Sequence, residues 1–289
     1  MMMSMKIKLL KNSVMAIVLC IFATVAAGQG NTSGGIITGK TRYLDRMFDN
    51  LVIHSDIIFT ESVNENGVLQ KHRLDVYMPE GDVATARPVI LWIHGGGFTF
   101  GNDKTQKYIV EMASRFARMG YVGVSVDYRL RAKPRENFSS TVSEAVEDAL
   151  KGLDWIRKNS ESLRIDPEKI IVAGGSAGGM IAVTLCINDV SGSVRHNKTG
   201  IRALVNLWGS PDMESIPLDI DPGDPPAVIV HGAEDALVPL VNSEKLAAAL
   251  AMKNVPHELV VIPGAGHTPV AHMDDFGGKI AAFLFEWIR

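Results

Sequence analysis

One short stretch near the middle of the chain constrains its fold more than any other. An apolar run at 170–173 is followed directly by Gly-Gly-Ser-Ala-Gly-Gly, in which the serine is Ser176, and then by a second apolar run. A strand that turns sharply into a helix needs small residues around the turn, because larger side chains would collide with the backbone. The pattern therefore predicts a strand, a tight turn and a helix, with Ser176 at the apex. Taken alone, it also fits a turn of small residues that simply closes a strand.

Segments suited to strands alternate with segments suited to helices along most of the chain. Buried parallel strands are typically apolar along their length. The run at 89–93 is continuously apolar, and largely apolar runs lie at 121–126, 203–207, 227–231 and 258–262. Helical patterns lie at 108–119, 143–158, 242–252 and from residue 273. This alternation predicts an α/β fold with a doubly wound, mostly parallel sheet flanked by helices. Two earlier runs, at 51–59 and 72–78, predict an antiparallel start to the sheet.

The N-terminal segment is expected to be a signal peptide. Lys6, Lys8 and Lys11 precede an apolar stretch at 13–27, which ends in small residues. Positive charge, an apolar core and small residues in this order are typical of secretory signals. The apolar stretch has about 15 residues, whereas a membrane-spanning helix needs roughly 20, so a membrane anchor is the weaker interpretation. We therefore expect cleavage of residues 1–28, export to the periplasm or the exterior, and no stable membrane insertion afterwards.

Beyond that segment the composition favours a single domain. Residues 29–50 begin with a stretch rich in Gly, Ser, Thr and Asn and are expected to form an N-terminal linker, and 51–289 to form one α/β catalytic domain. The net charge is −3 and no basic run occurs, which argues against a nucleic-acid partner. Cys186 is the one cysteine outside the predicted signal peptide, so we expect no internal disulfide.

Four groups that can carry chemistry directly follow predicted strands. They are the glycine run 95–97, Ser176, Asp235 and His267. Because the carboxyl ends of parallel strands lie at one edge of a sheet, these groups are expected to converge there. A serine hydroxyl needs a base to take its proton, and that histidine needs a carboxylate to fix its tautomer. We therefore predict Ser176 as the nucleophile, His267 as the base and Asp235 as the acid.

The sequence leaves alternatives for two of these roles. Histidines that compete with His267 for the role of base are His196, His231, His257 and His272. Carboxylates that compete with Asp235 are Asp127, Asp212 and Glu234. We prefer His267 and Asp235 because both lie in loops that directly follow predicted strands, in the chain order Ser, Asp, His.

The run His94-Gly95-Gly96-Gly97 is the second informative motif. Backbone N–H groups can stabilise the oxyanion of acyl transfer only where no side chain blocks the approach. Gly96, Gly97 and, after the serine, Ala177 are therefore predicted to form an oxyanion hole. A glycine-rich turn after a strand and a phosphate-binding loop are the alternatives. Neither the Lys-Ser/Thr pair nor the Gly-x-Gly-x-x-Gly spacing of phosphate-binding loops is present.

Together these motifs resemble the α/β-hydrolase superfamily, and within it the carboxylesterases of the hormone-sensitive-lipase-like and secreted carbohydrate-esterase-like groups. The likeness extends from about residue 70 to the C-terminus. Besides the serine and glycine motifs, it rests on Asp127-Tyr128-Arg129-Leu130, Asp235-Ala236-Leu237-Val238-Pro239 and Gly266-His267. The resemblance implies an α/β-hydrolase fold, the three catalytic roles given above, and a supporting role for Asp127 beneath the oxyanion loop.

The lid and the pocket are less well defined by the sequence. The connection at 208–226 is short and no large cap precedes the domain, so we expect a small lid or none and an open cleft. Phe98, Tyr128 and Trp208 are candidates to shape the substrate pocket, with packing in the core as the alternative. The likeness to small secreted esterases implies acetyl or feruloyl esters of plant polysaccharides as substrates.

The sequence thus predicts a secreted serine carboxylesterase that works through an acyl-enzyme on small-molecule or polysaccharide esters. No metal and no cofactor are expected. An amidase, arylformamidase or S9-like peptidase on the same fold is one alternative, and a non-catalytic binding protein on a hydrolase fold is another. The oligomeric state and the choice between acyl groups are not indicated by any motif.

Overall fold

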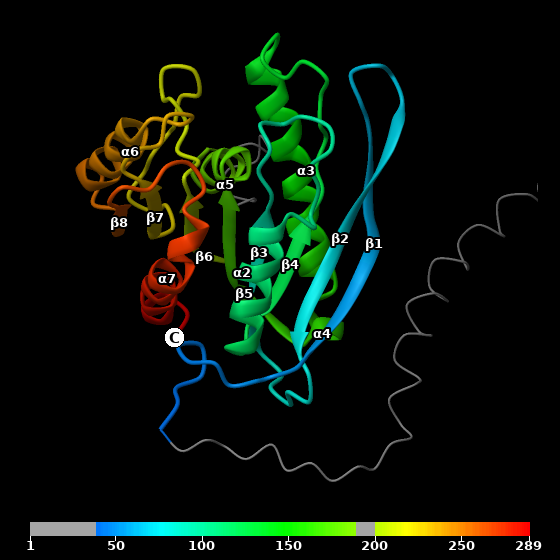
Figure 1. Ribbon diagram of the computed structural model, residues 1–289. Coiled ribbons are helices and arrows are strands. Elements are labelled where there is room, and N and C mark those ends of the chain that lie inside the picture. Colours follow the sequence, from blue (N-terminus) through cyan, green and yellow to red (C-terminus); the bar gives the residue numbers. More distant parts are fainter. Residues whose placement is uncertain (1–38, 189–199) are drawn as a thin grey trace, which may run out of the picture. The chain divides into compact units, whose positions relative to one another are not determined.

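Eight strands form one sheet in the computed structural model, which describes residues 39–188 and 200–289 (Figure 1). The strands are β1 (Leu51–Val63), β2 (Leu69–Pro79), β3 (Arg87–Ile93), β4 (Val122–Val126), β5 (Ile165–Gly175), β6 (Ile201–Leu207), β7 (Ala227–Gly232) and β8 (His257–Ile262). Their order across the sheet is β1-β2-β4-β3-β5-β6-β7-β8. The pairs β1–β2 and β2–β4 are antiparallel and the other pairs are parallel, which confirms the predicted doubly wound sheet with an antiparallel start.

Helices cover both faces of this sheet. They are α2 (Lys107–Arg118), α3 (Phe138–Lys158), α4 (Ser160–Leu163), α5 (Ala177–Ile187), α6 (Leu240–Met252), the short 3-10 turn η1 (Val270–His272) and α7 (Met273–Trp287). In Figure 1, α2 and α7 lie in front of the sheet. Alternate residues of β3 enter the two cores: Leu91 and Ile93 pack with α3 and α5, whereas Trp92 packs with α2. Since both faces are covered, β3 is buried along its whole length, as its unbroken apolar run predicts.

Part of the predicted linker packs against the domain. The N–H of Tyr43 donates to the Met119 carbonyl at 2.8 Å, and the Tyr43 ring lies edge-on to Tyr121 with the centroids 5.1 Å apart. Arg42 forms an ion pair with Asp82. These residues of the 29–50 segment thus pack on the domain, and a linker over 29–50 stays a prediction. Isolated aromatic and charged residues without periodicity gave no sign of these contacts.

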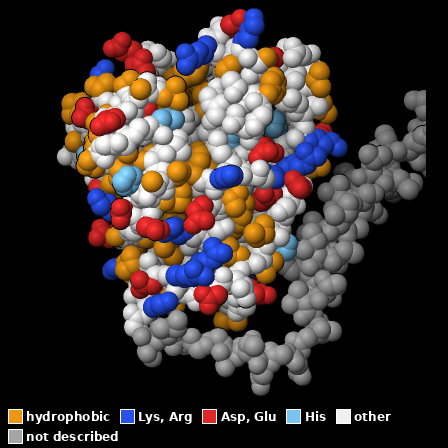
Figure 2. Space-filling model, in the orientation of Figure 1, with side chains coloured by type: hydrophobic (Ala, Val, Ile, Leu, Met, Phe, Trp, Pro, Cys, Tyr) orange, Lys and Arg blue, Asp and Glu red, His pale blue; other side chains and the backbone are white. Residues whose placement is uncertain are grey.

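Two features from the sequence analysis fall outside the described residues. The predicted signal peptide at 1–28 lies within 1–38, and His196, one of the alternatives for the base, lies within 189–199. In the part of the chain that is described, no helix has both the length and the apolar character needed to span a membrane. On the face drawn in Figure 2, acidic and basic side chains are interspersed.

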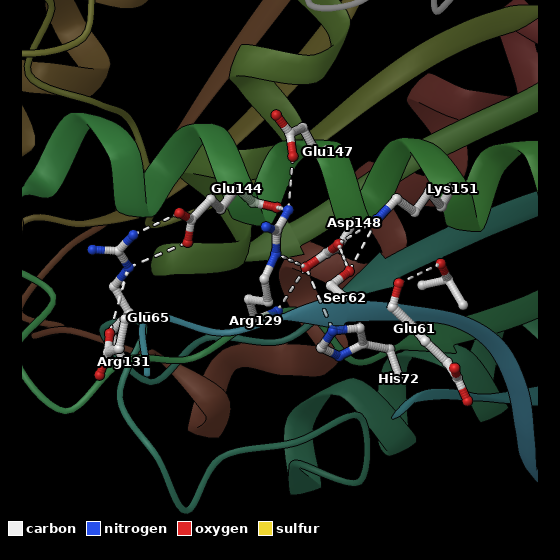
Figure 3. A network of polar contacts seen from close by, with 11 residues as sticks. Glu61, Ser62, Glu65, His72, Arg129, Arg131, Glu144, Glu147, Asp148 and Lys151 are labelled. Carbon is white, nitrogen blue, oxygen red and sulfur yellow. Dashed lines mark hydrogen bonds and ion pairs between the residues drawn. The ribbon is translucent and has the colours of Figure 1, made fainter. Parts of the chain in front are cut away.

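A buried carboxylate ties the first hairpin and the segment after β4 to helix α3 (Figure 3). Asp148, fully buried on α3, accepts hydrogen bonds from Ser62 Oγ at 2.6 Å and from Arg129 Nε at 2.7 Å. Lys151 Nζ donates to it at 3.1 Å, and the His72 ring lies 3.6 Å away. Because a buried charge is tolerated only when it is paired and hydrogen-bonded, these groups stabilise the fold as one unit.

The same segment is held again two residues further along. Arg131 pairs with Glu144 of α3 at 2.6 Å and lies 3.6 Å from Glu65 of the first hairpin. Residues 129–131 are thus fixed to α3 and to the first hairpin. The residues that follow them form one wall of the cavity described below.

We expect Asp148→Asn to lower the free energy of unfolding by about 3 kcal/mol at pH 7, since it removes the negative charge that pairs with Arg129 and Lys151. Burial by itself would raise the pKa of Asp148, but hydrogen bonds from Arg129 and Ser62 hold that pKa below its ordinary value. A depressed pKa gives stability that is present above the unfolded-state pKa and is lost as the pH falls through the folded-state pKa.

The difference in the free energy of unfolding between variant and wild type should therefore shrink below about pH 4, where the carboxylate is protonated in the unfolded state. Urea unfolding at several pH values measures this difference. Asp154→Asn is the matched control, because this more exposed carboxylate on the same helix pairs with Arg157, and its loss should cost about 0.5 kcal/mol or less. An equal effect of Asp148→Asn at pH 3 and pH 7 would contradict this account.

Candidate active site

The turn between β5 and α5 holds Ser176 in a backbone conformation that most residues avoid. Its φ is 55° and its ψ is −120°. Such a conformation is strained for a residue with a side chain and persists only where the surroundings impose it. The neighbouring glycines permit the close contacts: a Cβ on Gly174 would collide with the Gly178 carbonyl, and one on Gly178 with the Ile93 carbonyl. The Ser176 N–H donates to Leu207 at the end of β6 at 2.9 Å, which secures the turn.

Three loops at the carboxyl edge of the sheet bring the predicted triad together. His267, in the loop after β8, has Nε2 2.9 Å from Ser176 Oγ and Nδ1 2.7 Å from Asp235 Oδ2. Asp235 lies in the loop after β7, and its Oδ1 accepts the N–H groups of Leu237 and Val238 at 2.9 and 3.0 Å. The convergence expected from the strand ends is thus what the structure contains.

The charge state of Asp235 sets the roles of the two histidine nitrogens. Burial alone would raise its pKa, but the hydrogen bonds from His267 and from two backbone N–H groups lower the pKa of Asp235 below its ordinary value. At neutral pH it is therefore a carboxylate, which can only accept hydrogen bonds. The proton of neutral His267 accordingly lies on Nδ1, and the lone pair of Nε2 faces the Ser176 hydroxyl. This arrangement can remove the proton from that hydroxyl.

The glycine loop presents free donors beside the serine. Gly96 and Gly97 have φ values of 105° and 61°, which suit glycine. The Gly95 N–H donates to Gln106 Oε1 at 2.9 Å, which anchors the start of the loop. Within the described residues, no hydrogen bond uses the N–H groups of Gly96, Gly97 or Ala177. All three residues line the cavity that holds Ser176, so the predicted oxyanion-hole residues lie beside the serine with their donors unused.

Asp127 supports this loop from below. Its two carboxylate oxygens accept the backbone N–H groups of Lys104 at 3.0 Å and Arg73 at 3.2 Å. Burial raises the pKa of Asp127 above its ordinary value. The residue thus connects the segment after the glycine loop to β2, in agreement with the supporting role that the resemblance implied, and it does not contact Ser176.

A cavity of about 1120 Å³ opens above Ser176 and His267. Its wall includes Phe98, as predicted. Apolar or aromatic side chains that the sequence analysis missed also line it: Tyr108, Phe138, Met180, Leu237 and Val238. Residues 133–136, the segment fixed through Arg129 and Arg131, form part of the wall. The positions of 237–238 beside Asp235 and of Met180 one helical turn after Ser176 offered a signal, whereas Tyr108 and Phe138 come from other elements, α2 and α3.

Two of the pocket candidates take the alternative place, in the core. Trp208 is fully buried and packs between Tyr108 and Phe276, with ring centroids 5.4 and 5.9 Å away. Tyr128 is also buried, stacks on His94 at 4.3 Å and donates its hydroxyl to the His94 carbonyl at 2.9 Å. Neither lines the cavity. Aromatic residues just past a strand end can point into the core as easily as into a cleft, and the sequence does not distinguish the two.

The rival residues occupy other places. His231 is buried in β7, His257 contacts the Val255 carbonyl, and His272 lies near Asp275. Glu234 is exposed, Asp212 lines the cavity, and His196 lies outside the described residues. The connection 208–226 contains turns and bends without a helix, as expected for a small lid or none.

Among the described residues, no group of three or more His, Cys, Asp or Glu side chains is arranged to hold a metal ion.

The elbow leads to a test that does not depend on activity. A Cβ added at Gly175 would lie 2.5 Å from the Tyr108 hydroxyl and 2.7 Å from its ring, so Gly175→Ala should lower the free energy of unfolding by about 1–3 kcal/mol. Gly266→Ala is the matched control beside His267, since its Cβ would meet only the Glu234 carbonyl, at 3.8 Å. Urea unfolding compares them, and equal stability of the two variants would contradict the packing described here.

Comparison with known proteins supports the fold. The BD-FAE family matches residues 74–219, just over half of the chain, and the prolyl oligopeptidase family matches 215–289. A propionate-bound esterase from Thermogutta terrifontis superposes with a TM-score of 0.64 at 24% identity, over 81% of this chain and 93% of its own. A truncated carbohydrate esterase from gut microbiota gives 0.65 at 20% identity, over 82% and 96%.

The curated relatives are longer than this chain. The probable carboxylic ester hydrolase LipM of Mycobacterium tuberculosis is 26% identical over 75% of this chain and 57% of its own length. An isoprenylcysteine alpha-carbonyl methylesterase of Arabidopsis thaliana is 25% identical over 74% and 58%. The chain thus spans less than two thirds of these relatives. With the mixed sheet, the serine elbow and the family match over half its length, this chain belongs to the BD-FAE family and has the fold of the α/β-hydrolase carboxylesterases.

Proposed function

We propose that this chain is a serine carboxylic ester hydrolase. One observation carries the proposal: a serine, a histidine and a carboxylate form a continuous hydrogen-bonded series, and three unused N–H groups lie on the same cavity. A nucleophile with its base and a set of oxyanion donors are the parts that acyl transfer requires. The esterases among its relatives support the same reaction class.

The reaction would proceed through an acyl-enzyme. Ser176 Oγ attacks the carbonyl carbon while His267 Nε2 takes its proton, and the oxyanion accepts hydrogen bonds from the glycine loop and from Ala177. The bond to the alcohol oxygen breaks, and His267 gives the proton to that oxygen. A water molecule then loses a proton to His267 and attacks the acyl carbon. The acid leaves and Ser176 regains its proton. Asp235 stays ionised throughout and holds the imidazolium in place.

An amidase or peptidase reaction is the second candidate. It is favoured by the match of residues 215–289, which contain Asp235 and His267, to the prolyl oligopeptidase family. The same triad can cleave amides, so the preference for an ester or an amide depends on how the leaving group is protonated and bound. Turnover of an ester and an anilide with the same acyl group separates the two, and we expect the ester to react faster by far.

For the substrate, we propose a bulky ester, with feruloyl or acetyl groups on plant polysaccharides as the class. The cavity of about 1120 Å³ exceeds the roughly 300–1,000 Å³ of most small-ligand sites. Its aromatic and aliphatic wall, with Phe98, Phe138 and Met180, suits an aromatic acyl group better than acetyl. Export is part of this proposal, because a polymer outside the cell needs an exported enzyme, and the pattern at 1–28 is that of a secretory signal.

Ser176→Ala should reduce kcat for p-nitrophenyl acetate by about 10⁴-fold or more, since the nucleophile is lost while the fold is kept. Steady-state kinetics measure this. Ser162→Ala, at a half-buried serine on α4 away from the cavity, is the matched control and should retain wild-type kcat. Full turnover by Ser176→Ala would reject the proposed function.

Met180→Trp should narrow the cavity from α5. We expect kcat/KM for methyl ferulate to fall by about tenfold or more, because a pocket discriminates strongly against a group that no longer fits. Methyl acetate has the same alcohol and a small acyl group, so its kcat/KM should change by less than about threefold. Met252→Trp at the exposed end of α6 is the control. Equal losses for both esters would refute a bulky acyl group in this part of the cavity.

A further inference from the structure

His231 has a defined place beside the triad although it does not serve as the base. We propose that it is a positioning residue that acts through Asp235, held by a buried series of polar side chains that continues to the turn around Ser176. The proposal rests on the proposed function, because it assigns a role within the same site. It accounts for a fully buried histidine and three buried polar side chains that the reaction itself does not use.

The His231 ring secures the turn that carries the acid. Its Nε2 lies 2.8 Å from the Val238 carbonyl and 3.2 Å from Asp235 Oδ2. Val238 in turn donates its N–H to Asp235 Oδ1. One imidazole edge thus contacts both ends of the turn 235–238, and the contact with Oδ2 is on the same oxygen that accepts the proton of His267. Displacement of this ring would release the turn and the carboxylate together.

A single series of hydrogen bonds fixes the orientation of that ring. The Val238 carbonyl can only accept, so the neutral imidazole carries its proton on Nε2, and Nδ1 accepts from Ser243 Oγ at 2.7 Å. Ser243 Oγ then accepts from Ser210 Oγ at 2.6 Å, and Ser210 Oγ accepts from Asn206 Nδ2 at 2.7 Å. Each hydroxyl donates once and accepts once, so the series is satisfied in one direction only.

The far end of the series reaches the nucleophile. Asn206 Oδ1 accepts the N–H of Gly209 at 3.2 Å. A Cβ on Gly209 would collide with the Ser176 carbonyl and would lie 2.6 Å from Gly179 Cα. Trp208, which lies between Asn206 and Gly209 in the chain, donates its N–H to the carbonyl of Val230 at 2.7 Å, and Val230 is the neighbour of His231. The loop after β6 therefore contacts the serine turn on one side and, on the other, Val230 and Ser243, which are the neighbours of His231.

These contacts give the series a function beyond stability. The base works only if Asp235 keeps Nδ1 of His267 in line, and a shift of about 1 Å in a catalytic group can cost about 100-fold in rate. His231 holds the carboxylate from behind, and the serines and Asn206 hold His231. The loss of His231 should therefore slow the chemistry through Asp235 and by no other route.

A double-mutant cycle tests this. The readout is the rate constant for covalent labelling of Ser176 by a fluorophosphonate probe, which needs the activated serine but not turnover of any particular substrate. His231→Leu should slow labelling by about tenfold in the wild-type background. It should have no further effect in the Asp235→Ala background, because a residue that acts only through Asp235 has nothing left to position. His231→Gln retains an N–H directed at the turn and should recover part of the rate.

Ser243→Ala provides a second variant if His231→Leu does not fold. It keeps the ring but removes the donor to Nδ1, and it should also slow labelling only when Asp235 is present. Thr184→Val, which removes a buried hydroxyl on α5 outside the series, should label like wild type, and thermal unfolding of every variant checks that the fold is kept.

Losses that multiply in the Asp235→Ala background, or unchanged labelling in both His231→Leu and Ser243→Ala, would overturn the positioning role while leaving the proposed function intact. Wild-type protein that is folded and does not label at Ser176 would overturn both.

Discussion

Close backbone contact around Ser176 is the constraint on which the rest of the site depends. The turn brings α5 so near the ends of β3 and β5 that no side chain fits at Gly174 or Gly178. On the other side, the loop after β6 approaches equally closely at Gly209. The backbone at Ser176 is held in a left-handed conformation by these neighbours, and the strain is maintained by the two buried cores of the sheet. A serine in such a turn is presented at the sheet edge, where loops from other strands can reach it.

The other groups of the site are positioned by buried polar contacts rather than by rigid elements. Asp235 is surrounded by donors from its own turn and from two histidines, and the glycine loop is anchored through Gln106 and Asp127. The wall at 133–138 depends on ion pairs that centre on Asp148 (Figure 3). Loops have little packing energy of their own, so such contacts give them the definition that a reaction requires.

Most of the fold and the triad could be predicted from the sequence. Apolar runs gave the parallel strands because central strands are buried on both faces. The positions after strand ends gave Ser176, Asp235 and His267 because the topology brings those ends together. The pocket could not be predicted in the same way. Whether Trp208 points into the core depends on Tyr108 and Phe276, which come from other elements.

The contacts of the segment before β1 and the role of His231 were also missed. Isolated residues such as Tyr43 carry no periodic signal, so only tertiary contacts reveal where they pack. His231 was judged as a possible base, since a sequence shows that a histidine follows a strand but not which atoms its two nitrogens meet. Its partner Ser243 lies on α6, and Ser210, which bonds Ser243, lies in the loop after β6.

The central claim is that Ser176 carries the acyl group during the reaction. Rapid mixing with p-nitrophenyl acetate, acid quenching and mass spectrometry of the digested protein measure it directly. We predict an early burst of nitrophenol and one acetyl group on the peptide that contains Ser176, which disappears as the substrate is consumed. In the His267→Ala variant the acetyl group should leave Ser176 slowly and therefore accumulate. Wild-type hydrolysis at the normal rate would contradict the account if neither protein gives an acetylated Ser176 peptide.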